Sequence, residues 1–142
     1  MAVRVMVVER YEFVRDALRI AILPMPGLEL VAEASNASEA VGLAVDENPD
    51  VILLDVDWPS LDGLAVAPLL RQAVPAALIV MYSSEPGFET HDRGFDGGEA
   101  AMAAGADVYL TAAATLEEMV AALHATPATW RRERHLEEEL VG

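Results

Sequence analysis

Short apolar runs alternate along the chain with longer stretches in which apolar residues recur at helical spacing. Apolar runs of four to eight residues between amphipathic stretches are typical of strands in a parallel sheet that helices cover on both faces. The pattern therefore predicts an α/β fold built from repeated βαβ units. The predicted strands are Val3–Val8, Leu28–Ala34, Val51–Leu54, Ala77–Tyr82 and Asp107–Leu110.

The second predicted strand differs from the others, because it alternates. Leu28, Leu30 and Ala32 would share one face, and Glu29, Val31 and Glu33 the other. Such a period of two is expected for a half-exposed strand at the edge of a sheet.

Helical stretches are predicted between the strands. In the first, Tyr11–Leu23, the apolar face would consist of Phe13, Ala17, Leu18, Ala21 and Ile22. The second would be capped by Asn36 or Ser38 and run to about Glu47.

The sequence also indicates where two later helices are interrupted or begin. The helix Asp62–Gln72 contains Pro68, which predicts either a kink or a late start near that residue. Thr115–Glu118 is a capping box that would open a helix toward His124. The glycine-rich stretch Glu85–Gly98 reads as one long, mobile loop.

The balance of acidic and basic residues disfavours some classes of function. The 142 residues carry 24 Asp and Glu against 9 basic residues, a net charge of -15, which disfavours direct binding to nucleic acid or to an anionic membrane. All basic residues are arginines, and cysteine is absent. The chain therefore has no lysine for Schiff-base or phosphate-loop chemistry and needs no oxidising compartment. No apolar run is long enough to span a membrane, so we expect a cytoplasmic protein.

Polar residues follow the ends of the predicted strands. Glu9 and Arg10 follow the first strand, Asp55 ends the third and Ser83 follows the fourth. Ligands of open parallel sheets bind beyond the carboxyl ends of the strands. Asp55 is the central candidate, because packing does not explain an acid that ends an apolar strand.

The motif around Asp55 resembles the receiver domains of bacterial two-component response regulators, particularly those that precede helix-turn-helix output domains. Asp55 is followed at the family's spacing by Pro59 and then by Asp62–Gly63, and Gly105–Leu110 resembles the family's fifth strand. The resemblance implies a receiver domain over residues 1–125 and a helical tail or linker over residues 126–142. It also implies a flavodoxin-like, doubly wound five-stranded sheet of order 2-1-3-4-5 in three α/β/α layers.

The same resemblance implies roles for individual residues. Asp55 would accept a phosphoryl group from a histidine kinase, with Mg²⁺ held by Glu9, Asp55 and the backbone carbonyl of Asp57. Ser83 would bind the phosphoryl group, and Tyr109 would follow it as the switch partner. The face formed by the fourth helix, the fifth strand and the last helix would then contact partners, including a second copy; the tail is an alternative dimer contact.

Two positions depart from the family pattern. Arg10 replaces the second acid of the metal site, and Ala112 stands where the family has a lysine. We expect Arg10 to weaken Mg²⁺ binding and to form an ion pair with Asp55. The hypothesis is an atypical receiver, phosphorylated weakly or not at all at Asp55, that is no enzyme beyond self-catalysed phosphoryl transfer and acts through protein contacts.

Two alternatives remain from the sequence. The first is a conventional Mg²⁺-dependent phosphoacceptor switch in which Glu9, Asp55 and Ser83 suffice. The second, a minor one, is a flavodoxin-like module that binds a small molecule under the loop Glu85–Gly98.

Overall fold

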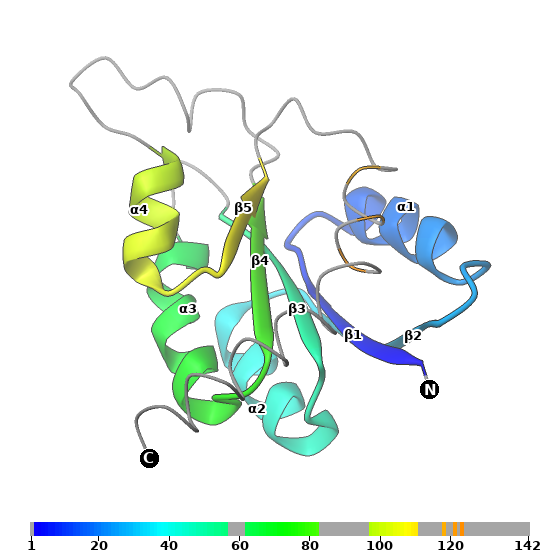
Figure 1. Cartoon of the computed structure of the whole chain (residues 1–142), viewed down its shortest axis with the longest axis horizontal. Helices are drawn as coiled ribbons and strands as arrows, with labels where there is room; N and C mark the ends of the chain where they lie inside the picture. The colour runs from blue at the N-terminus through cyan, green and yellow to red at the C-terminus, as the bar shows by residue number, and fades with distance from the viewer. Residues whose placement is uncertain are drawn as a thin grey trace, which may run out of the picture.

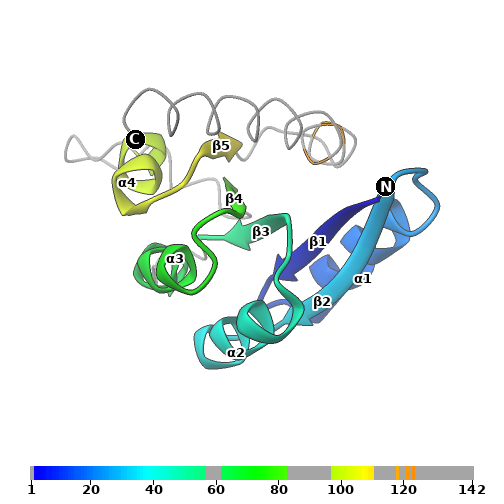
Figure 2. The same ribbon diagram turned by 60° about the horizontal axis from the view of Figure 1, so that its bottom comes forward.

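Five strands form one parallel sheet in the order β2-β1-β3-β4-β5 (Figure 2), so the predicted fold class and strand order are confirmed. The computed structural model describes residues 2–56, 62–82 and 97–110, together with Glu118, Ala121 and Leu123. The strands are β1 (Val3–Val8), β2 (Leu28–Ala34), β3 (Val51–Asp55), β4 (Leu78–Tyr82) and β5 (Val108–Leu110). The helices in the described part are α1 (Glu12–Ile22), α2 (Ala37–Glu47), α3 (Asp62–Ala73) and α4 (Gly97–Ala104).

The sheet separates two apolar cores. On one face, β-strand residues pack against α2, α3 and α4; on the other, they pack against α1 and Leu123. Figure 1 shows α4 and α3 on one side of the sheet and α1 on the other. β3 and β4 are buried along their whole length because both faces are covered. This layering matches the continuous apolar runs that predicted these strands.

A β-bulge at Val31 changes the faces of the edge strand β2. Val5 pairs with Leu30, but its neighbour Met6 pairs with Ala32, so Val31 is the extra residue. Leu30 consequently packs on the α1 side and Ala32 on the α2 side. The predicted alternation, with Leu28, Leu30 and Ala32 on one face, is therefore wrong beyond the bulge.

The buried face of α1 is narrower than the predicted one. Leu18 and Ile22 are buried, with Val14 and Ala21 packed against them. Phe13 is 74% exposed, so its predicted place in the core is wrong. Val14, at i−4 from Leu18, takes the position toward the sheet in its place.

The ends of α2 follow the sequence signals. Asn36 caps the helix, since its side-chain oxygen accepts a hydrogen bond from the Glu39 N–H at 2.9 Å. Asn48 ends it in the left-handed conformation at φ 46°, where asparagine is tolerated. Asn36 is thus the cap among the two predicted candidates.

α3 runs through Pro68 instead of beginning near it. The late start that the proline suggested is therefore wrong. Pro68 lies on the exposed side of the helix, where water can satisfy the backbone carbonyl that loses its partner.

Arg71, on the last turn of α3, ties that helix to the start of β5. Its guanidinium donates to the carboxylate of Asp107, which also accepts from the Ile79 N–H at 2.8 Å. A further donor reaches the carbonyl of Ala77 at 2.6 Å. These contacts fix β4 and β5 at their amino ends, opposite the edge where the candidate site lies.

The expectations for the remaining segments fall mainly outside the described residues. Of the predicted loop Glu85–Gly98, Gly97 and Gly98 belong to α4, and the rest is not described. Glu118, Ala121 and Leu123 are helical, and Leu123 is fully buried. Residues 126–142 are outside the described part, so the domain boundary stays a prediction. Among the described helices, none is long and apolar enough to cross a membrane.

Candidate functional site

The carboxyl ends of β1, β3 and β4 bring two acids and a tyrosine together. Asp55 is the last residue of β3 and pairs in register with Tyr82, the last residue of β4. Glu9 follows β1 directly, and β1 is the other neighbour of β3. Glu9 is only 1% exposed and Asp55 4%; they are the buried acidic residues of the described part. Two carboxyl groups so poorly hydrated require close partners.

Tyrosine groups hold both oxygens of Glu9. The Tyr82 hydroxyl donates a hydrogen bond to Oε2 of Glu9, and the backbone N–H of Tyr11 donates to Oε1 at 3.2 Å. The Tyr82 side chain is itself 2% exposed and belongs to the α1-side core. Glu9 therefore lies between the end of β4 and the start of α1.

The pKa of Glu9 shows how strongly the two acids interact. Burial, a side-chain hydrogen bond with Asp55 and the charge of Asp55 raise the pKa of Glu9 from 4.5 to about 8, whereas the Tyr82 hydroxyl and the Tyr11 N–H oppose this rise. Burial, followed by the charges of Glu9 and Asp55, raises the pKa of Tyr82 well above its usual value. Near neutral pH Glu9 therefore keeps its proton beside Asp55, and Tyr82 stays a hydroxyl donor.

Arg10 lies at the exposed edge of this cluster. Its guanidinium donates to the Tyr11 hydroxyl at 2.9 Å and lies over the Tyr11 ring, 4.9 Å from the centroid. Arg10 and Asp55 each have a further interaction, and the predicted ion pair between them stays a prediction.

Arg15 braces the loop that carries Glu9 and Arg10. One nitrogen of its guanidinium donates to the carbonyls of Glu9 at 2.7 Å and of Arg10 at 3.0 Å. The brace fixes the path of the chain between β1 and α1. It therefore helps to hold Glu9 beside Asp55.

The other predicted site residues lie apart from this cluster or outside the described residues. Tyr109 is half-buried on β5 and packs against the core that α2, α3 and α4 cover. Ser83, Asp57 and Ala112 are outside the described part. The Ser83–Tyr109 switch pair and the carbonyl of Asp57 as a metal ligand consequently stay predictions.

Sequence reasoning missed Tyr82, Tyr11 and Arg15. The strand Ala77–Tyr82 was predicted to end at Tyr82, so its position beside Asp55 was available from the strand order. A tyrosine that ends an otherwise aliphatic strand needs a partner for its hydroxyl, which is the signal that could have found it. Nothing comparable in the sequence marks Arg15.

The described residues fit a divalent cation poorly. Mg²⁺ keeps several waters and needs charged oxygens in octahedral array. Here Glu9 and Asp55 are nearly excluded from water, and donors occupy both oxygens of Glu9. No group of three or more His, Asp or Glu side chains able to hold a metal occurs in the described ranges.

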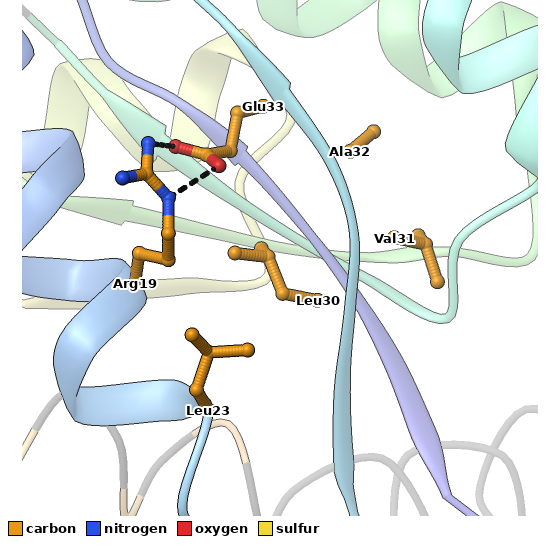
Figure 3. A pocket seen from close by; sticks show the side chains of 6 residues that line it. All are labelled: Arg19, Leu23, Leu30, Val31, Ala32 and Glu33. Carbon is orange, nitrogen blue, oxygen red and sulfur yellow. Dashed lines mark hydrogen bonds and ion pairs between the residues drawn. The ribbon is translucent and has the colours of Figure 1, made fainter.

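A separate hollow of about 480 Å³ lies between the end of α1 and the edge strand β2 (Figure 3). Leu23 and Leu30 line its apolar part. Arg19 and Glu33 face each other across its rim through two hydrogen bonds of 2.8 Å, and Arg19 also bonds Asp16 at 3.0 Å. The hydrogen bonds and charge of Glu33 raise the pKa of Arg19. The two charged residues that line the hollow, Arg19 and Glu33, are thus paired with each other.

Comparisons with known proteins agree with this geometry. The family model described as the response regulator receiver domain matches residues 5–124. The response regulator GacA of Pseudomonas aeruginosa is 32% identical over 123 residues, which cover 85% of this chain and 53% of the relative. The nitrate/nitrite response regulator protein NarL of Escherichia coli strain K12 is 29% identical, covering 87% and 54%. The chain thus spans about half the length of these curated relatives.

Solved structures show the same architecture. The signal receiver domain of the putative response regulator NarL from Mycobacterium tuberculosis has a TM-score of 0.74 at 27% identity, covering 89% of this chain and 97% of that one. A response regulator protein from Burkholderia pseudomallei, solved with a phosphorylated aspartic acid, a calcium ion and citrate, has a TM-score of 0.68 at 25% identity, covering 94% and 74%. The fold, the buried acids at the carboxyl edge and the match to the family model agree with one another. This chain therefore belongs to the response regulator receiver domains of two-component systems.

Proposed function

We propose that this receiver domain signals mainly through protein contacts and is phosphorylated weakly or not at all at Asp55. One observation carries the proposal: the acids at the carboxyl edge, Glu9 and Asp55, are buried against each other and against Tyr82. A carboxyl group that is shut off from water and packed against a second acid is poorly accessible to a phosphodonor and to a hydrated metal ion.

The cationic groups that phosphoryl transfer needs are also reduced. Arg10 follows Glu9 where a second acid would help to hold Mg²⁺, and the chain has no lysine to bind the transferred group. Removing one preorganised donor from a site of developing charge typically costs about 2.7 to 4 kcal/mol, or 10²- to 10³-fold in rate. Two such losses predict transfer slower by several orders of magnitude.

The conventional switch is the second candidate, and the position of Asp55 favours it. Asp55 ends β3 at the carboxyl edge, and the Burkholderia pseudomallei protein of similar fold carries a phosphorylated aspartic acid with a calcium ion. In this case Glu9, Asp55 and Ser83 would suffice for self-catalysed transfer.

Partners follow from the family and remain proposals for this chain. We infer a histidine kinase or another signalling protein as partner, and a second copy through α4, β5 and the last helix or through the tail. The match covers 53% and 54% of the two curated relatives, so the function of the rest of their length is not carried over to this chain. No nucleic acid or membrane contact is proposed for the domain itself, in keeping with its charge of -15.

The test is phosphorylation of the whole chain by a small phosphodonor in the presence of Mg²⁺, followed by intact mass over time. A receiver that has two acids after its first strand and a lysine after its fifth serves as the reference, and Asp55→Asn as the blank. We expect labelling at least 100-fold slower than the reference, in line with the loss of one to two stabilising groups. Labelling at the reference rate, abolished by Asp55→Asn, would establish the conventional switch instead.

A further inference from the structure

Tyr82 places a polar atom where packing alone would not require one. Its ring fills the α1-side core together with Leu18 and Leu53. An aliphatic or phenyl side chain would fill this space equally well, and a buried hydroxyl is costly without a partner. The hydroxyl has that partner in Oε2 of Glu9.

The same hydrogen bond controls which atoms of Glu9 are available. The Tyr11 N–H holds Oε1 from the α1 side, and the Tyr82 hydroxyl holds Oε2 from the β4 side. Glu9 is thereby kept in a pocket that excludes water, against Asp55. A hydrated cation must displace the hydroxyl or turn Glu9 before it can bind both acids.

We propose that Tyr82 is a positioning residue that closes the Glu9–Asp55 pocket to divalent cations by holding the Glu9 carboxyl group with its hydroxyl. This role deepens the proposed function and rests on it, but it is separate from the effect of Arg10. Arg10 acts by its charge at the exposed edge, whereas Tyr82 acts from within the core. The two contributions should therefore be separable by mutation.

The experiment measures Mn²⁺ binding by electron paramagnetic resonance of the free ion. It uses the full chain in four forms: unchanged, Arg10→Asp, Tyr82→Phe and the double variant. Asp55→Asn in each background gives the Mn²⁺ binding that does not depend on the pocket. This control is necessary because the acidic surface of the chain also attracts cations. Tyr82→Phe retains the ring and removes only the hydroxyl.

We expect Tyr82→Phe to tighten the Asp55-dependent Kd about tenfold in both backgrounds, which is the upper end of the usual worth of a single hydrogen bond. A Kd that Tyr82→Phe leaves within twofold in both backgrounds would overturn the inference. If Arg10→Asp alone then gives tight binding, the inference fails while the proposed function stands. If the unchanged chain binds Mn²⁺ tightly and is labelled rapidly by the phosphodonor, the proposed function fails first.

A second measurement on the unchanged chain keeps the inference testable if Tyr82→Phe does not fold. A buried hydroxyl proton that is bonded to a carboxylate exchanges slowly enough to be observed by proton NMR. We expect the Tyr82 hydroxyl resonance to persist unshifted in a large excess of Mg²⁺. Saturable loss or shift of this resonance would show that the ion opens the pocket.

Discussion

The hydroxyl of Tyr82 and the carboxyl group of Glu9 form a buried hydrogen bond between residues 73 positions apart in the chain. The bond joins the end of β4 to the loop after β1, across the intervening strand β3. Removal of this bond should therefore lower the stability of the whole sheet. We expect Tyr82→Phe to lower the free energy of unfolding by about 1 to 3 kcal/mol, because a buried acceptor loses its donor.

Urea unfolding measures this loss, and Tyr11→Phe is the matched control. The Tyr11 hydroxyl accepts a hydrogen bond from the exposed guanidinium of Arg10, so its removal should change stability by less than about 0.5 kcal/mol. Equal effects of the two variants would contradict the assigned role of the buried bond.

The raised pKa of Glu9 predicts a pH dependence of stability. Because folding raises the pKa of Glu9 from 4.5 to about 8, the folded state binds more protons than the unfolded state between these values. Stability should be full below pH 4.5 as far as this group is concerned, and should fall as the pH rises toward 8. The fall is of the order of a few kcal/mol, since one pKa unit corresponds to about 1.4 kcal/mol.

Unfolding in urea at several pH values across this range tests the dependence. Glu9→Gln should flatten the curve, because the amide does not titrate. Glu12→Gln removes the same charge from an exposed position and should leave the slope as it is. A slope that Glu9→Gln leaves unchanged would assign the dependence to other groups.

Asp107 is expected to be important for the pairing of β4 and β5. Asp107→Asn weakens its ion pair with Arg71, whose side chains are 11% and 23% exposed, and weakens the acceptor for Ile79. We expect a loss of about 2 kcal/mol, intermediate between exposed and fully buried pairs. Glu47→Gln, which breaks the more exposed pair with Arg4, should cost less than about 1 kcal/mol. Denaturant midpoints of the two variants give the comparison, and a larger cost for Glu47→Gln would contradict it.

Truncation of the two apolar residues Phe13 and Leu18 of α1 should change the free energy of unfolding by very different amounts. Leu18→Ala removes a buried side chain and should cost about 2 to 5 kcal/mol. Phe13→Ala removes an exposed one and should change stability by less than about 0.5 kcal/mol. Thermal unfolding by circular dichroism distinguishes them. Similar losses of stability for both variants would show that the Phe13 side chain packs in the core after all.

The sequence supports the architecture more than the site. The apolar runs that became β3 and β4 are continuous because both faces are covered, and that pattern is visible in the chain alone. Glu9 and Asp55 were recognisable as candidate site residues, because packing does not explain an acid at the end of an apolar strand. The bond between Tyr82 and Glu9 was not, since it depends on which faces the ends of two non-adjacent strands present.

Departures from regular periodicity explain the errors. An extra residue at Val31 shifts every later side chain of β2 to the opposite face, and no local feature marks it. As a result Glu33 lies on the α1 side, where it meets Arg19. In α3 the proline was read as a breaker, although an exposed ring is tolerated within the helix.

The irregularity at Val31 has a consequence for self-assembly. β2 is an outermost strand, and its unpaired backbone groups would otherwise be a template on which further chains could stack into fibrils. One surplus residue breaks the regular spacing of donors and acceptors that such stacking requires. The bulge therefore disfavours the stacking of further chains along β2.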